Sequence, residues 1–294
     1  MVSVRVSRAP LTADRQRDRG RRYSAQFVAA AVLIGAVVVV SLLAPVLAPY
    51  DPLATDPAAK FLPPGSAGHL LGTDDLGRDL LSRLLWGGRT SLLLAVLAVA
   101  AATVAGSGAG LLAGFAGPKV SGAVMRVVDM LFAFPVILVA VALAAVLSPG
   151  PVVVVAAIVF TVVPYVTRVV FTEVKQQVRR EYVEAATALG ATRWELMVRE
   201  VLPNARGAIV VYGTGMVATM VVFSASLSAV GIGVQPPTPD WGQMIASGAK
   251  VVLSGHMHVA VTPGLAVVVV ALAFNWLGDA LHDLSNPRTR ESRR

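Results

Sequence analysis

The chain of 294 residues contains no cysteine. Disulfide bonds, zinc–thiolate sites and thiol catalysis are therefore excluded, and cysteine usage says nothing about the redox compartment. Charged residues are also scarce: they make up 14% of the sequence, whereas soluble domains carry roughly a quarter. Hydrophobic residues make up 55%, and the mean hydropathy is +0.70. These values are typical of a protein with several membrane-spanning helices.

The net charge of +8 could also indicate a nucleic-acid partner. The Lys and Arg residues, however, lie in short polar segments between long apolar ones, and not in a basic domain with a groove-reading motif. The tendency of Lys and Arg to remain on the cytosolic side of a membrane explains this distribution better. We therefore expect membrane lipid, and no nucleic acid, around this chain.

Apolar segments long enough to cross a membrane recur along the chain, which predicts an all-α polytopic membrane protein with six transmembrane helices. The first segment is too long for the core of a signal peptide, so we expect it to be retained. The expected spans cover about residues 27–47, 90–115, 125–147, 151–172, 207–230 and 259–281. The chain then divides into a basic tail, a first helix with an external segment, a five-helix core and a second basic tail, at residues 1–24, 25–88, 89–282 and 283–294.

The basic residues also predict the orientation. If the N-terminus is cytosolic and six spans alternate, only five of the 25 Lys and Arg residues lie outside: Lys60, Arg78, Arg83, Arg89 and Lys250. Both termini and the polar segment 173–206 then face the cytosol, as the positive-inside rule requires. We expect a multi-pass protein of the cell (plasma or inner) membrane.

The external segment ends in an apolar repeat that predicts an amphipathic helix. Thr73 or Asp74 could cap it, and Leu76, Leu80 and Leu84 recur every four residues. We expect the Asp and Arg residues of this stretch to pair with each other or to cap helices.

In the following span, glycines at four-residue spacing predict a face on which another helix packs closely: Gly106, Gly110 and Gly114.

The polar segment between the fourth and fifth spans predicts two short helices with a tight break. No Pro or Gly interrupts Gln176–Leu189, and Gly190 follows the last apolar residue of that pattern, where glycine suits a left-handed cap. Thr192 and Glu195 have the spacing of a capping box that opens a second helix. Pro203 should end this second helix near Leu202.

This segment resembles the EAA loop of ABC importer permeases, in the run Glu184-Ala185-Ala186, Gly190 and Val201-Leu202-Pro203-Asn204. The resemblance implies coupling helices that dock on a cytosolic ATPase subunit, with an anchoring carboxylate, small residues for close approach and a glycine that sets the angle. Glu200 departs from the pattern, since many members carry an apolar residue there. The other interpretation is an ordinary amphipathic loop helix. The implied coupling residues are Glu184, Ala185, Ala186, Gly190, Leu202 and Pro203.

Three further stretches resemble the C-type inner-membrane subunit of dipeptide, oligopeptide and nickel importers. They are Gly72-Thr73-Asp74 with Gly77-Arg78-Asp79, the run 224–241, and the closing pattern 273–288, where His282 and Asn286 replace the usual Arg and Asp. The resemblance implies a type I ABC importer fold and a subunit that forms half of the pathway. It implies as partners a homologous B-type permease subunit, two cytosolic ATP-binding subunits and an external substrate-binding protein. Di- or oligopeptides are the first substrate class, and nickel or a metal chelate the second.

The sequence contains no nucleotide-binding motif and no catalytic constellation, so we do not expect an enzyme or a cofactor, and ATP would be bound by partner subunits. His256 and His258 lack a third ligand and do not predict a metal site. Polar residues within the apolar spans are the candidates for lining the pathway, although each could equally hydrogen-bond a neighbouring helix. They are Thr161, Tyr165, Thr219, Ser224, Ser226 and Asn275.

Ionisable residues within the spans bear on a rival class, an ion-coupled secondary transporter. Only Asp129 and Asp279 come close to the required position. Asp129 follows Arg126 by three residues, which predicts a local ion pair near the membrane interface in preference to a proton relay.

Overall fold

A computed structural model describes residues 11–285, with side chains over residues 25–283, and contains helices but no strand within that part of the chain. The long helices are α1 (Leu11–Leu42), α3 (Leu80–Phe115), α4 (Pro118–Ala133), α5 (Val136–Leu147), α6 (Pro151–Gln177), α9 (Leu202–Ala229) and α11 (His258–Ser285). The short elements are α2 (Ala44–Leu47), η1 (Pro57–Ala59), α7 (Glu181–Ala188), α8 (Arg193–Glu195), η2 (Leu196–Val201), α10 (Trp241–Ala249) and η3 (Val252–Ser254).

The described residues cover only part of the two expected tails. The helix that contains the first span begins at Leu11, well before residue 25, because no proline interrupts the chain between Pro10 and Pro45. At the other end, Asn286, Pro287 and Arg288 of the closing pattern lie outside the described residues.

Among residues 11–285, five helices are long and apolar enough to cross a membrane, and a sixth crossing is obtained if α4 and α5 count together. The expected third span is therefore not one straight helix. It bends by 85° between Ala133 and Val136. The cause is Pro135, which lacks an N–H group and disfavours helical geometry at Phe134, the residue before it.

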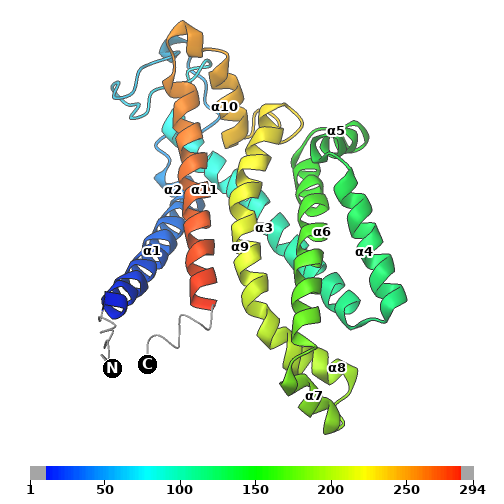
Figure 1. The fold of residues 1–294 in the computed structure, drawn as a ribbon. Helices are drawn as coiled ribbons and strands as arrows, with labels where there is room; N and C mark the ends of the chain where they lie inside the picture. The colour runs from blue at the N-terminus through cyan, green and yellow to red at the C-terminus, as the bar shows by residue number, and fades with distance from the viewer. Residues whose placement is uncertain (1–10, 286–294) are drawn as a thin grey trace, which may run out of the picture.

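The helices pack so that two polar regions lie at opposite ends of the molecule (Figure 1). Helices α3, α6, α9 and α11 form the body, α1 lies against α11, and α4 flanks α6. The 48–79 segment and α10 lie at one end, and α7 and α8 lie at the other. The beginning of α1 and the end of α11 lie on the same side as α7 and α8.

The tight contact between α3 and α6 confirms the predicted glycine face. A Cβ atom placed on Gly106 would lie 2.8 Å from the carbonyl oxygen of Val163, and one on Gly110 would lie 2.7 Å from that of Thr167. On Gly114 it would lie 2.3 Å from a methyl group of Val174. Only glycine permits this approach, so the three positions fix how closely the two helices pack.

The 48–79 segment contains a polar cluster where the sequence predicted an amphipathic helix. Asp74 does not cap a helix: it is buried in a turn and forms ion pairs with Arg78 at 2.7 Å and Arg83 at 3.4 Å. Helix α3 begins only at Leu80, where the Asp79 carboxylate accepts a hydrogen bond from the Ser82 N–H.

The reason for this difference is the backbone at Gly77. Its φ angle is +75°, which a continuous right-handed helix excludes, and the backbone of Asp56 fills the space beside it. The prediction that these Asp and Arg residues pair with each other and cap helices is confirmed.

Helix α10 (Trp241–Ala249) is bound to α3 by a buried carboxylate at its N-terminus. Asp240 accepts hydrogen bonds from the Ser91 hydroxyl at 2.7 Å and from the Gln243 N–H at 3.1 Å. The Trp241 indole donates to the Leu84 carbonyl at 2.9 Å. Burial raises the pKa of the Asp240 carboxyl, and the hydrogen bonds from Ser91 and Gln243 oppose that rise.

The glycine contact gives a test in which the chain supplies its own control. We expect Gly110→Val to destabilise the protein by about 1–3 kcal/mol, because the added methyl groups would overlap the α6 backbone. Gly108→Val in the same helix meets no atom within 4 Å and should change stability far less. Thermal unfolding of the two purified variants would compare them. Equal melting temperatures would show that the α3–α6 distance does not depend on Gly110.

The polar cluster around Asp74 gives a second test. Asp74→Ala leaves Arg83, which is 2% exposed, without its carboxylate partner, and should cost about 3–5 kcal/mol. The neighbouring Asp75 is 42% exposed and lies 3.7 Å from Arg78, so Asp75→Ala should cost no more than about 1 kcal/mol. Similar losses of thermal stability in both variants would contradict a specific role for the buried pair.

Candidate functional site

The sequence predicts one uninterrupted helix in the first part of the polar segment between α6 and α9, but the structure contains a turn there. Helix α6 ends at Gln177, and α7 begins at Glu181 after a turn in which the Arg180 N–H donates to the Gln177 carbonyl. No proline or glycine marks this turn, so the pattern of residues gave no signal for it. The change of direction allows Val183 of α7 to become buried against the body of the protein.

The break after α7 has the predicted geometry. Gly190 has a φ angle of +89°, a left-handed conformation that glycine adopts without steric cost. Thr192 and Glu195 form the capping box: the Thr192 N–H donates to the Glu195 carboxylate at 2.9 Å, and the Glu195 N–H donates to the Thr192 hydroxyl at 3.3 Å.

We expected the second helix to end near Leu202, but it continues beyond this residue. It passes through the π-helical turn η2 directly into α9, and Arg193–Ala229 forms one helical stretch of 37 residues. Pro203 lies in the first turn of α9, where the wider π turn accommodates its ring and its missing N–H. The Asn204 side chain donates a hydrogen bond of 2.6 Å to the carbonyl oxygen of Glu200. Glu200, the departure from the family pattern, is half-buried in this turn.

The loop presents a partly apolar surface at the tip of the molecule. Of the coupling residues that the sequence suggested, Glu184, Ala185, Gly190 and Pro203 are exposed, and Ala186 and Leu202 are half-buried. Sequence reasoning missed the two most exposed large apolar side chains of the loop, Leu189 at 89% and Trp194 at 67%. Leu189 directly precedes the capping Gly190, and Trp194 lies inside the capping box of Thr192 and Glu195. Their place at the turn was therefore predictable from the sequence, but their exposure was not.

The six residues suggested for the pathway occupy different environments. Thr219, Ser226 and Asn275 are exposed, and Thr161 and Tyr165 are half-buried. Ser224 is fully buried within this subunit. The Thr161 and Ser226 hydroxyls donate to carbonyl oxygens of their own helices, at 2.8 and 2.9 Å.

Asp129 does not pair with Arg126, as its spacing had predicted. Its carboxylate accepts a hydrogen bond from the guanidinium group of Arg168, which joins α4 to α6. The same guanidinium lies over the ring of Phe132, 4.6 Å from the ring centre. A contact between residues 39 positions apart cannot be read from local spacing.

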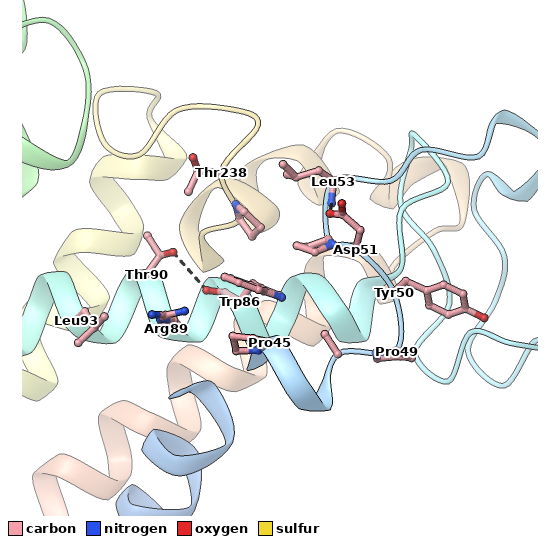
Figure 2. A pocket seen from close by; sticks show the side chains of 13 residues that line it. Pro45, Pro49, Tyr50, Asp51, Leu53, Trp86, Arg89, Thr90, Leu93 and Thr238 are labelled. Atoms are coloured by element: carbon pink, nitrogen blue, oxygen red, sulfur yellow. Dashed lines mark hydrogen bonds between the residues drawn. The ribbon is translucent and has the colours of Figure 1, made fainter. Parts of the chain in front are cut away.

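A cleft of about 770 Å³ opens at the end of the molecule opposite α7 (Figure 2). It lies between residues 45–53, the first turns of α3 and the loop before α10. None of the six suggested pathway residues lines it. Nearby, His256 stacks on Phe61 with ring centres 4.2 Å apart, and the described residues contain no group of three potential metal ligands.

The geometry therefore defines a helical membrane protein with a rigid, exposed helix–turn–helix at one end and a structured segment at the other. Solved structures share this fold. Chains in two inward-facing crystal structures of the MetNI methionine ABC transporter superpose with TM-scores of 0.57 and 0.58, at 21% identity, over 72% and 73% of this chain and 97% and 98% of theirs.

Sequence comparison identifies the family. Residues 106–291 match the family described as the binding-protein-dependent transport system inner membrane component, and the chain belongs to it. The di/tripeptide transport system permease protein DppC of Pseudomonas aeruginosa is 39% identical over 87% of this chain and 86% of its own. The probable D,D-dipeptide permease DdpC of Escherichia coli is 35% identical over 89% of this chain and 87% of its own. The glutathione permease GsiD of Pectobacterium atrosepticum is 35% identical over 93% of this chain and 91% of its own. The predicted family and fold class are thus confirmed, and the chain is a multi-pass inner-membrane permease of the ABC importer class.

Proposed function

We propose that this permease imports small peptides and that its 173–206 segment couples the membrane helices to cytosolic ATP-binding subunits. A homologous B-type permease subunit would complete the pathway, and an external substrate-binding protein would deliver the peptide. ATP binds to the partner subunits, and this chain has no cofactor and no enzymatic activity of its own. The printed names of the three relatives favour peptides over nickel or a metal chelate.

The observation that carries the coupling proposal is the exposed tip formed by α7, Gly190 and α8. Leu189 and Trp194 expose large apolar side chains on either side of Gly190, and burying them against a partner would be favourable. Glu184 supplies a carboxylate on the same α7 helix, and Ala185 leaves room for a close approach. This combination of apolar side chains, one charge and small residues suits a groove on another subunit.

The connection to α9 supplies the mechanical part of the proposal. Because α8, η2 and α9 form one helical stretch, a displacement of the tip cannot be absorbed by a flexible loop. The buried side chains Leu196, Met197 and Val201 hold the same turn against the body. ATP binding would move the membrane helices only if the tip makes different contacts in the two conformations, since equal contacts shift no equilibrium.

The orientation belongs to the same proposal: α7 and α8 are cytosolic, and the 48–79 segment is external. The distribution of Lys and Arg supports it. The placement of the start of α1 and the end of α11 beside α7 and α8 agrees with an even number of crossings (Figure 1).

The coupling surface can be tested by introducing a charge. We expect Leu189→Glu to abolish co-purification of the ATP-binding subunits with the tagged permease, because a carboxylate would replace an apolar side chain in the contact. Leu253→Glu is the control, since Leu253 is fully exposed at the opposite end and should retain every partner. Retention of the ATP-binding subunits by the Leu189→Glu complex would exclude this surface as the contact.

The orientation can be tested with single cysteines, because the chain has none of its own. A membrane-impermeant thiol reagent added to intact cells should label Ser66→Cys and leave Thr187→Cys unlabelled until the cells are opened. Ser66 lies in the external segment and Thr187 is exposed on α7. The reverse pattern of labelling would invert the topology.

A further inference from the structure

Helix α6 carries a line of four polar residues along one of its sides. Thr161, Tyr165, Arg168 and Thr172 follow each other at intervals of four, three and four residues, which places them on one face of the helix. We call this line the polar stripe. Tyr212 of α9 extends it, because its ring meets that of Tyr165 edge to face with centres 6.4 Å apart.

The charged part of the polar stripe lies at a depth where lipid tails would surround an unshielded residue. Arg168 is roughly 26 Å from Pro151 and 14 Å from Gln177 along α6, at about 1.5 Å per residue. A hydrocarbon layer about 30 Å thick therefore extends beyond Arg168 in both directions. Its partner Asp129 lies well inside α4, roughly 16 Å from Pro118.

The exposure of this ion pair shows that its surroundings must be polar. The side chain of Arg168 is 47% exposed and that of Asp129 is 64% exposed. Ionised groups facing lipid at this depth are strongly disfavoured, and such residues face water, a cavity or another protein chain. A polar line from Thr161 to Thr172 is also what a hydrophilic solute requires to cross the membrane.

The pair has the chemistry to bind a zwitterion. Within the described part of the chain, Arg168 uses only its Nη2 atom for Asp129, so other N–H donors remain for a carboxylate. Asp129 can accept hydrogen bonds from an ammonium group in place of the guanidinium. A free peptide carries both charges, so it can take over each half of the pair without leaving either half uncompensated.

We propose that the polar stripe lines the translocation pathway and that Arg168 and Asp129 bind the carboxylate and the ammonium group of the peptide in transit. This inference rests on the proposed function and adds the residues that contact the substrate. It also gives Thr161 and Tyr165, two of the suggested pathway residues, a common surface.

The first experiment asks whether the polar stripe faces water. Thr161→Cys lies near the middle of α6, and Leu97→Cys lies near the middle of α3 with a parent side chain that is 63% exposed. We expect a charged, water-soluble thiol reagent to label position 161 at least tenfold faster than position 97 in the assembled transporter in lipid nanodiscs, with any cysteines of the partner subunits replaced. Equal or reversed rates would overturn the proposed lining.

The second experiment separates substrate binding from a purely structural ion pair. The complete transporter with its binding protein is reconstituted, and ATP-driven uptake of dialanine is compared with basal ATP hydrolysis. We expect R168Q and D129N each to lower uptake at least tenfold while ATP hydrolysis stays within twofold. The exchange D129R/R168D restores the ion pair but reverses its direction, so uptake should remain at least tenfold low.

Recovery of wild-type uptake by D129R/R168D would show that the pair only joins α4 to α6 and would overturn the binding role. Unchanged uptake in R168Q and D129N would do the same. If the wild-type complex takes up no dialanine, the proposed peptide substrate fails, whereas the labelling rates at positions 161 and 97 still decide whether the polar stripe faces water.

Discussion

The arrangement of the membrane helices depends on the close contact between α3 and α6. Three glycines on α3 let the two backbones approach until a single additional carbon atom would overlap carbonyl oxygens of α6. Between helices in lipid, such close packing replaces the hydrophobic driving force that water provides elsewhere. The other helices are placed against this pair: α9 packs on both of its members, and α4 and α5 pack on α6.

A second constraint operates at the end of the molecule opposite α7 and α8 (Figure 1), where polar groups are buried. The ion pairs of Asp74 and the hydrogen bonds of Asp240 attach the 48–79 segment and α10 to the first turns of α3. These contacts satisfy each carboxylate that burial would otherwise destabilise. This end is therefore a structured region that is fixed to the same helix as the glycine face.

The sequence predicted the features that depend on local chemistry. The glycine face, the left-handed turn at Gly190 and the capping box of Thr192 and Glu195 all follow from residue type and short spacing, and the structure contains them. The family was also accessible, because its motifs are local. The outward orientation of Leu189 and Trp194 was not, because exposure depends on how the whole loop packs.

Predictions failed where distant contacts decide the conformation. The helix expected from residue 73 is replaced by a turn, because Asp56 fills the space beside Gly77. Asp129 pairs with a residue on another helix, and no spacing along one helix contains that information. At Pro203 the local rule correctly identified a clash between the proline ring and a regular α-helix. It did not predict the wider π turn that relieves this clash.

The π turn at Leu196–Val201 has a consequence for how this loop can vary between relatives. A π turn holds one residue more than the corresponding α-helical turn, so it is a place where the chain length can change by one without breaking the helix. Deleting that residue would return the segment to an α-helical turn, and the residues on both sides would keep nearly the same directions around the axis of α9. The length of the chain can thus change by one residue at this point, while the exposed tip keeps its orientation relative to the membrane-spanning helices.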